Sequence, residues 1–270
     1  MAFRMHEADT LVWLTSQQLE DCKAIRHGFS TRRGGVSPAP WDSLNLAIGR
    51  PDGSEAVQEN YRRFCCVLGV NPKNVVLPQQ THSINIRRVT AADAGKGLWH
   101  QRDYQQVDGL ITNEPNLSLV VFSADCGIVL LYDPVHHAAG AVHAGWRGCA
   151  NGIPEKAVAD MQAAFGSDPA QLLAAIGPCI GQCCFETDSD VPEAMRAALG
   201  QDAEPYLQWR DPKFHVDLEG LNRQWLLRAG LLSANIDTCG LCTACHPELF
   251  WSHRKMGEQR GAQVALISLC

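Results

Sequence analysis

The 270-residue sequence lacks an apolar run of the about 20 residues that a transmembrane helix needs. Its first ten residues include Arg4, His6, Glu7 and Asp9 where a signal peptide would have its apolar stretch. We therefore expect a cytoplasmic protein without a membrane partner. Because cytosolic thiols are kept reduced, the twelve cysteines are not expected to form a disulfide framework.

An excess of positive charge is also lacking, because 29 acidic residues outnumber 23 lysines and arginines and give a formal net charge of −6. Nucleic acids and anionic membranes bind proteins through extended basic surfaces, so neither is expected as a partner. A single phosphate group needs only a local cation. The sequence has no internal repeat, and its hydrophobic content of 46% excludes a disordered chain.

Helical and strand patterns alternate along the chain without a strict βαβ rhythm, which favours one α+β domain with a mixed sheet over residues 1–270. Val57, Tyr61, Phe64 and Leu68 recur at helical spacing before Gly69. Two further helices are predicted, at 154–165 and at 217–228 with Asp217 as N-cap. Strands are predicted at 77–89 (broken by Pro78), twice within the apolar run 117–132, and at 138–143, 172–176 and 263–269.

Reactive polar residues stand at the ends of three apolar segments: His82, Cys126 and His143. Two imidazoles and one thiolate are a plausible zinc ligand set, and three protein ligands leave the open fourth position of a catalytic zinc site. A second interpretation drops the metal and makes Cys126 a nucleophile activated by His143, with Asp125 or Gln80 orienting the imidazole. The residues alone leave both interpretations open.

Other cysteine and arginine groups invite functional interpretations. Cys239, Cys242, Cys245 and His246 resemble a zinc knuckle, but Cys179, Cys183 and Cys184 do not supply a second pair at CxxC spacing, so buried reduced thiols are favoured. Arginines in glycine-rich loops can grip a phosphate, although solvated or ion-paired side chains are the simpler interpretation. The arginines concerned are Arg32, Arg33 and Arg147.

A set of short motifs resembles a known family and follows its order along the chain. They are HGFSTR-x-GGVS at 27–37, SLNL at 43–46, Q-x-H at 80–82, ADC at 124–126, HAGWRG at 143–148, IGP-x-I at 176–180, CFE at 184–186, CT at 242–243 and FWSHR at 250–254. This pattern resembles the bacterial YfiH-type family, also labelled multicopper polyphenol oxidase or laccase-domain proteins and purine nucleoside phosphorylases. Trp251 and His253 stand where that family usually has phenylalanine and tyrosine, and QQTHS replaces its commoner QVHG.

The resemblance implies a single α/β/β/α-layered domain, similar to the catalytic domain of cytotoxic necrotizing factor. It also implies a zinc site on His82, Cys126 and His143, which would be the catalytic residues. Arg32, Asn45 and Arg147 are the candidates for binding substrate or phosphate.

Three activities follow as hypotheses. The first is a zinc-dependent, monomeric enzyme whose partners are purine nucleosides and phosphate. It would phosphorolyse adenosine, inosine, guanosine and methylthioadenosine, and it would also deaminate adenosine. The second is copper-dependent oxidation of phenols, which we rank low because the sequence has no His-x-His pair and copper readily occupies N/S sites adventitiously. The third is a Cys-His thiol hydrolase or amidase, such as a peptidoglycan-precursor editing enzyme.

Overall fold

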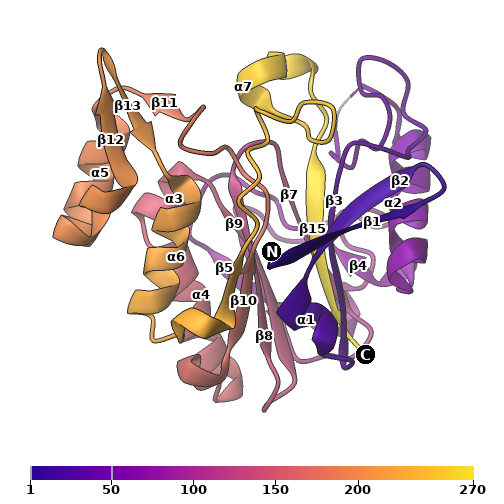
Figure 1. Ribbon diagram of the computed structural model, residues 1–270. Helices are drawn as coiled ribbons and strands as arrows, with labels where there is room; N and C mark the ends of the chain where they lie inside the picture. The colour runs from indigo at the N-terminus through magenta and orange to yellow at the C-terminus, as the bar shows by residue number, and fades with distance from the viewer. Residues whose placement is uncertain (1, 50) are drawn as a thin grey trace.

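Two six-stranded sheets stack face to face in the computed structural model, which describes residues 2–49 and 51–270 (Figure 1). The first sheet contains, in spatial order, β1 (Phe3–Ala8), β2 (Leu11–Ser16), β3 (Ile25–Ser30), β15 (Gln263–Leu269), β7 (Ser118–Ser123) and β4 (Val75–Val76). The second contains β14 (Ile236–Thr238), β10 (Leu173–Ile176), β8 (Gly127–Asp133), β9 (Ala138–Ala144), β6 (Gly109–Thr112) and β5 (Ile86–Arg88). Both sheets are mixed, since β4–β7, β10–β14 and β5–β6 are parallel pairs.

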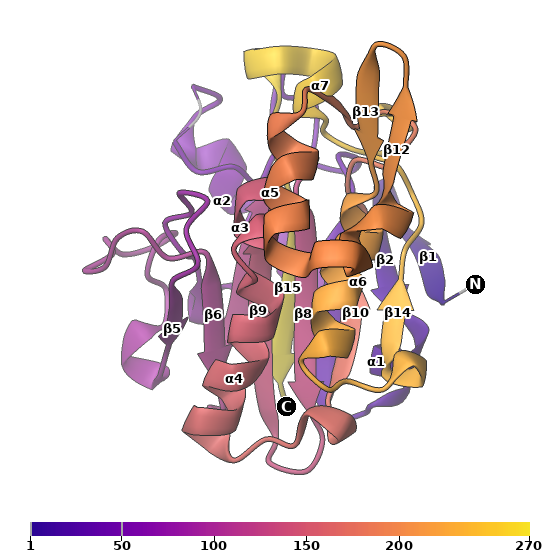
Figure 2. The same ribbon diagram turned by 90° about the vertical axis from the view of Figure 1, so that its left-hand side faces the viewer.

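Helices cover the outer face of each sheet and complete the predicted α/β/β/α layers. The helices are α1 (Gln17–Asp21), α2 (Ser54–Leu68), α3 (Trp146–Ala150), α4 (Ile153–Phe165), α5 (Asp190–Leu199), α6 (Leu218–Arg228) and α7 (His253–Met256). Short 3₁₀ helices lie at Pro72–Asn74, Ala91–Asp93, Pro169–Gln171, Gly200–Tyr206, Ser233–Asn235 and Gly257–Gln259. In Figure 2 the helices α4 and α6 lie in front of the second sheet, with α5 above them. Beside α5 stands a small third sheet of β11 (Glu186–Thr187), β13 (Lys213–Val216) and β12 (Leu207–Arg210).

Apolar side chains fill the space between the sheets and the space under each helical layer. The inner faces meet through residues such as Phe29, Val121 and Leu130. The strand β8 is buried along its whole length, because one face meets the other sheet and the opposite face meets helices. Strands buried on both faces read as continuous apolar runs, which explains the uninterrupted hydrophobicity of this stretch.

Most of the predicted elements are confirmed. The helix α2 buries Val57, Tyr61, Phe64 and Leu68 against the first sheet and ends at Gly69, whose φ of 69° is the left-handed conformation that glycine tolerates. The Asp217 side chain caps α6 by accepting the backbone N–H of Gly220. The run 117–132 forms the two strands β7 and β8.

The predicted strand at 77–89 is wrong. Only Val75–Val76 and Ile86–Arg88 pair, and they belong to different sheets. Pro78 has no N–H for a ladder, and the N–H groups of Thr81 and Ser83 donate to the side chain of Asp108 instead of a strand. This segment is therefore a crossing loop, and it carries His82 to one edge of the sheets.

The antiparallel register brings the start of β8, the end of β9 and the start of β6 to that same edge. Gly127, the first residue of β8, pairs with Ala144, the last residue of β9. Gly109, the first residue of β6, pairs with Val142. Within the described residues, no helix is both long enough and apolar enough to cross a membrane.

Candidate metal centre and cavity

His82, Cys126 and His143 meet at the edge where these strands end. His82 lies in the loop between β4 and β5, Cys126 in the turn between β7 and β8, and His143 near the end of β9. Their ligand atoms all lie within 4.8 Å of one another, and the Cys126 Sγ is 3.8 Å from the His82 Nε2. His143 is buried, Cys126 is half-buried and His82 is exposed, so the group faces solvent on one side.

A buried carboxylate organises this group. Asp108, immediately before β6, accepts the backbone N–H groups of Thr81, His82 and Ser83 at 2.8–3.0 Å and the Ser83 hydroxyl at 2.7 Å. Its Oδ1 also lies 2.9 Å from the His143 Nδ1. Burial opposes the charge on Asp108, but the hydrogen bonds from His143, Ser83 and Thr81 outweigh it and hold the pKa at about 2.

His143 and Cys126 stabilise each other's charged forms. Burial disfavours the charge on both groups, yet the neighbouring imidazole lowers the pKa of the Cys126 thiol. The thiolate, together with the Asp108 hydrogen bond, in turn raises the pKa of His143 above its usual range. The Asp108 contact fixes Nδ1 of His143 as the protonated nitrogen, which leaves Nε2 to face a metal ion or the thiol.

The residues present fit a zinc ion. Two imidazoles and one thiolate are a borderline-soft donor set that suits zinc, and a carboxylate behind a ligating histidine is its usual support. Gly145 keeps the cradle open, since a Cβ at this position would lie 2.7 Å from the Cys126 Sγ and 3.3 Å from the His82 Cδ2.

Neither residue expected to orient the imidazole does so. Asp125 accepts the Thr243 hydroxyl at 2.6 Å and the backbone N–H of Arg254 at 2.7 Å. Gln80 pairs with the backbone of Phe122. Asp108 has the orienting role, and a sequence signal for it existed, because it stands immediately before the apolar strand β6.

A cavity of about 390 Å³ opens over the exposed side of the three side chains. Its lining is His82, Ala124, Asp125, Cys126, Trp146, Arg147, Ile180, Phe185, Leu218, His253, Arg254 and Arg260. A smaller hollow of about 240 Å³ shares His82, Ala124, Cys126 and Arg260 with it. The arginines at 254 and 260 were not among the predicted site residues, although the first stands in a cationic run of the sequence.

Of the three predicted substrate-binding residues, Arg147 alone lines the larger cavity. Its guanidinium is exposed and stacks on the Trp146 ring at 4.3 Å. The Arg32 guanidinium lies 4.1 Å over the Trp251 ring and donates to the carbonyls of Asp42 and Pro247, beside a separate hollow.

Asn45 is fully buried in the loop before α2. Its amide donates to Asp52 at 2.6 Å, and its Oδ1 accepts the backbone N–H groups of Ala47 and Ala262. Ala47 and Ala262 both line the smaller hollow, so the hydrogen bonds from their N–H groups to Asn45 hold that part of its lining in place.

This fold is shared with known proteins. The family model described as "Multi-copper polyphenol oxidoreductase laccase" matches residues 26–270, and the chain belongs to this family. It is 34% identical over 258 residues to "Purine nucleoside phosphorylase YlmD" of Bacillus subtilis, covering 94% of this chain and 92% of that protein.

Two solved structures share the fold over nearly the whole chain. The crystal structure of the hypothetical protein YfiH of Bacillus licheniformis superposes with a TM-score of 0.91 at 33% identity, covering 99% of each chain. YlmD from Geobacillus stearothermophilus gives a TM-score of 0.91 at 32% identity, covering 99% of this chain and 98% of that one. The layered α+β prediction is thereby confirmed.

Proposed function

We propose that this chain is a purine nucleoside phosphorylase that works in the larger cavity. The observation that carries the proposal is the pairing, in one cavity, of a metal-capable His-Cys-His group with an exposed arginine. Apolar and aromatic walls at Trp146, Ile180 and Phe185 suit a purine ring, and a guanidinium suits a phosphate. The relatives named as purine nucleoside phosphorylases support purine nucleosides as the substrate class. Within that class we propose adenosine, inosine, guanosine and methylthioadenosine as the substrates.

In phosphorolysis a phosphate oxygen attacks the ribose anomeric carbon, the glycosidic C–N bond breaks, and the purine leaves with a proton. Arg147 would hold the phosphate and offset its charge beside that carbon. Asp108 would keep the His143 ring and the 81–83 loop in place, so that the reacting groups meet in a fixed geometry. The products are ribose 1-phosphate and the free base.

We propose zinc, held by His82, Cys126 and His143, as the resident metal. When bound, it supplies Lewis-acid chemistry at one open coordination position. Within the described residues, metal-capable side chains gather in two groups, and neither contains more than two histidines. That scarcity of imidazoles disfavours a multicopper centre and agrees with copper being adventitious.

Adenosine deamination takes second place in this proposal. Zinc-dependent deaminases move protons with a carboxylate that is not a metal ligand. Among the described residues that line the larger cavity, Asp125 is the one carboxylate, and its two oxygens are engaged by Thr243 and Arg254. Phosphorolysis needs no such carboxylate.

The test is to measure products from adenosine across a range of phosphate concentrations, using wild-type protein and an Arg147→Ala variant. Losing one charge-assisted contact is expected to raise the KM for phosphate by about tenfold or more, with zinc content unchanged. Arg33→Ala, an exposed arginine outside this cavity, is the matched control. If adenosine yields inosine and no ribose 1-phosphate, the enzyme is a deaminase and the proposed phosphorolysis is wrong. If the KM for phosphate is unchanged in Arg147→Ala, Arg147 does not bind phosphate.

A thiol hydrolase is the second candidate, because Asp108, His143 and Cys126 form the acid–base–nucleophile chain of cysteine enzymes. Such an enzyme would attack an amide carbonyl with the Cys126 thiolate and would need no metal. Coordination and nucleophilic attack use the same sulfur lone pairs, so the two functions exclude each other for this residue.

A further inference from the structure

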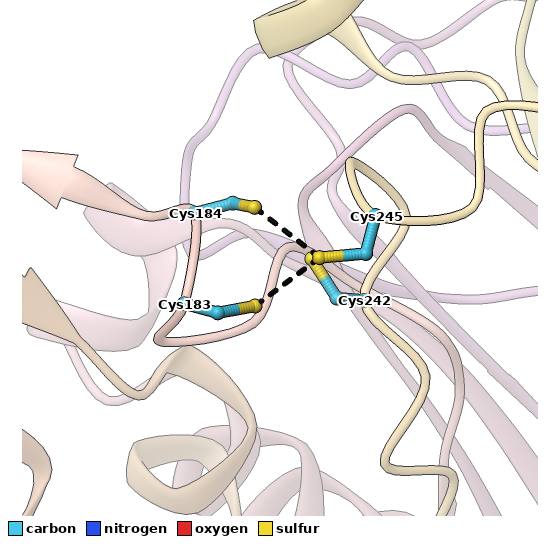
Figure 3. Close-up of side chains that lie close together, drawn as sticks. All are labelled: Cys183, Cys184, Cys242 and Cys245. Carbon is cyan, nitrogen blue, oxygen red and sulfur yellow. Dashed lines mark hydrogen bonds between the residues drawn. The ribbon is translucent and has the colours of Figure 1, made fainter.

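Four cysteines outside the candidate active site gather at one point. Figure 3 shows the two pairs approaching each other from two loops, one between β10 and β11 and the other between β14 and α7. The Cys245 Sγ lies 3.5 Å from that of Cys183 and 3.4 Å from that of Cys184. All four sulfur atoms, those of Cys183, Cys184, Cys242 and Cys245, lie within 4.8 Å of one another.

We propose that these four thiolates bind one structural zinc ion in a closed tetrahedral site. With Zn–S bonds of about 2.3 Å, the sulfurs of such a site lie about 3.8 Å apart, which is within the observed spacing. A disulfide would need about 2.05 Å, and all four cysteines are free. Four thiolates leave no open coordination position, so this ion would hold structure and take no substrate.

The backbone around the cluster is arranged as for a metal knuckle. The N–H groups of Cys245 and His246 donate to the carbonyl of Cys242, which closes a tight turn. Both cysteines of this CxxC pair point their sulfurs to the same place (Figure 3). The N–H of Gly181 donates to the Cys242 Sγ at 3.2 Å, and such a donor stabilises a ligating thiolate. A Cβ at Gly181 would lie 3.1 Å from the Cys242 Cβ, so glycine permits this close approach.

The second pair escapes sequence reasoning because Cys183 and Cys184 are adjacent and not in CxxC spacing. The turn preceding β11 nevertheless brings both sulfurs toward Cys245. The guanidinium of Arg254 donates to the carbonyls of Cys184 and Glu186, which places a positive charge beside a site that would carry a net negative charge.

The ion would clamp together two walls of the larger cavity. Ile180 and Phe185, from the first loop, line the cavity. On the second loop, Thr243 lies next to Cys242 and donates to Asp125, the neighbour of Cys126. Removing the ion would therefore loosen this part of the cavity wall without removing a ligand of the His-Cys-His group.

The experiment measures zinc per chain by elemental mass spectrometry in protein purified without added metal. The Cys183→Ser/Cys245→Ser variant changes two exposed cysteines, and Cys66→Ser, an exposed cysteine of α2, is the matched control. We expect the double variant to lose one zinc per chain, both in the wild-type background and in a Cys126→Ala background, and the control to lose none. Because the Cys126→Ala background removes a ligand of the first site, failure of the proposed function leaves this result unaffected.

An unchanged zinc content in the folded double variant would overturn the proposal. Should that variant not fold, X-ray absorption at the zinc edge of the Cys126→Ala protein decides instead. Four sulfur neighbours at about 2.3 Å support the site, and nitrogen or oxygen neighbours, or no retained zinc, contradict it. Alkylation under denaturing, non-reducing conditions completes the test, because thiols locked as disulfides would also overturn it.

Discussion

Asp108 has the largest influence of any single side chain on the candidate site. It is fully buried, and it binds the loop that carries His82 as well as the ring of His143. Backbone strain accompanies this arrangement, since His82 has a φ of 61° although it is not glycine. The carboxylate thus determines the conformation of the 81–83 loop. It also determines which ring nitrogen of His143, namely Nε2, is left to face a metal ion or the thiol.

The state of Cys126 distinguishes the metal enzyme from the thiol enzyme. If the thiolate is a zinc ligand, we expect iodoacetamide to label Cys126 slowly in the native protein and quickly after a chelator removes the metal. Activity on nucleosides should fall with the metal. The measurement is the rate of Cys126 labelling by peptide mass spectrometry, with exposed Cys66 as the internal reference. Rapid labelling of untreated protein, with activity lost in step and no metal released, would favour the thiol hydrolase.

At the scale of elements, one residue of α2 supports the loop residues at 36–45. Asn60 on α2 is fully buried and donates to the Ser37 hydroxyl at 2.9 Å and the Asn45 carbonyl at 2.8 Å. Its Oδ1 accepts the N–H of Val36 at 2.8 Å. A loop rich in glycine and proline cannot form regular ladders, so these side-chain contacts satisfy its buried backbone groups.

Replacing this residue tests that account. Asn60→Ala removes the acceptor of the Val36 N–H and the donor to the buried carbonyl of Asn45, and it should lower the free energy of unfolding by about 3 kcal/mol. Chemical denaturation measures this loss, and limited proteolysis should find new cleavage within 31–49. Glu55→Ala, at an exposed position on the same helix, is the control and should change stability by less than about 0.5 kcal/mol. Equal stability of the two variants would show that the loop is held by other contacts.

At the scale of the whole molecule, a buried histidine couples stability to pH. His27 of β3 is buried, and its Nε2 accepts the N–H of Ser16 at 2.9 Å, which requires a neutral ring. Burial lowers the pKa of His27 to about 4. Between about pH 6.5 and pH 4 the unfolded chain binds a proton that the folded protein does not, so stability falls as the pH falls.

The protonation of His27 in the unfolded chain is expected to lower the free energy of unfolding by about 3 kcal/mol as the pH falls from 6.5 to 4. Below about pH 4 this loss stays constant. In a His27→Gln variant, whose amide oxygen can still accept the Ser16 N–H, this part of the pH dependence should disappear. Urea unfolding at several pH values measures it for wild type, His27→Gln and the exposed-site control His100→Gln. Parallel profiles of wild type and His27→Gln would contradict the assignment.

Local patterns in the sequence were sufficient for most of the secondary structure. The helix α2 and the strands β7 and β8 follow from hydrophobic spacing, because a buried stripe or a doubly buried strand leaves its periodicity in the chain. The three candidate metal ligands could also be proposed, since short motifs and strand ends mark them.

Tertiary structure alone decided which other side chains the candidate site residues contact. The orienting role of Asp108, and not Asp125, depends on the register of β6 with β9, which no local pattern encodes. The gathering of Cys183 and Cys184 with Cys242 and Cys245 joins loops far apart in the chain, so spacing rules could not find it. Arg32 and Arg147 look alike in the sequence as arginines in glycine-rich segments, and each stacks on a tryptophan ring. The Arg32 guanidinium also donates to the carbonyls of Asp42 and Pro247, whereas Arg147 lines the cavity. Sequence determines which side chains are available, and the long-range pairing of strands and loops determines which of them meet.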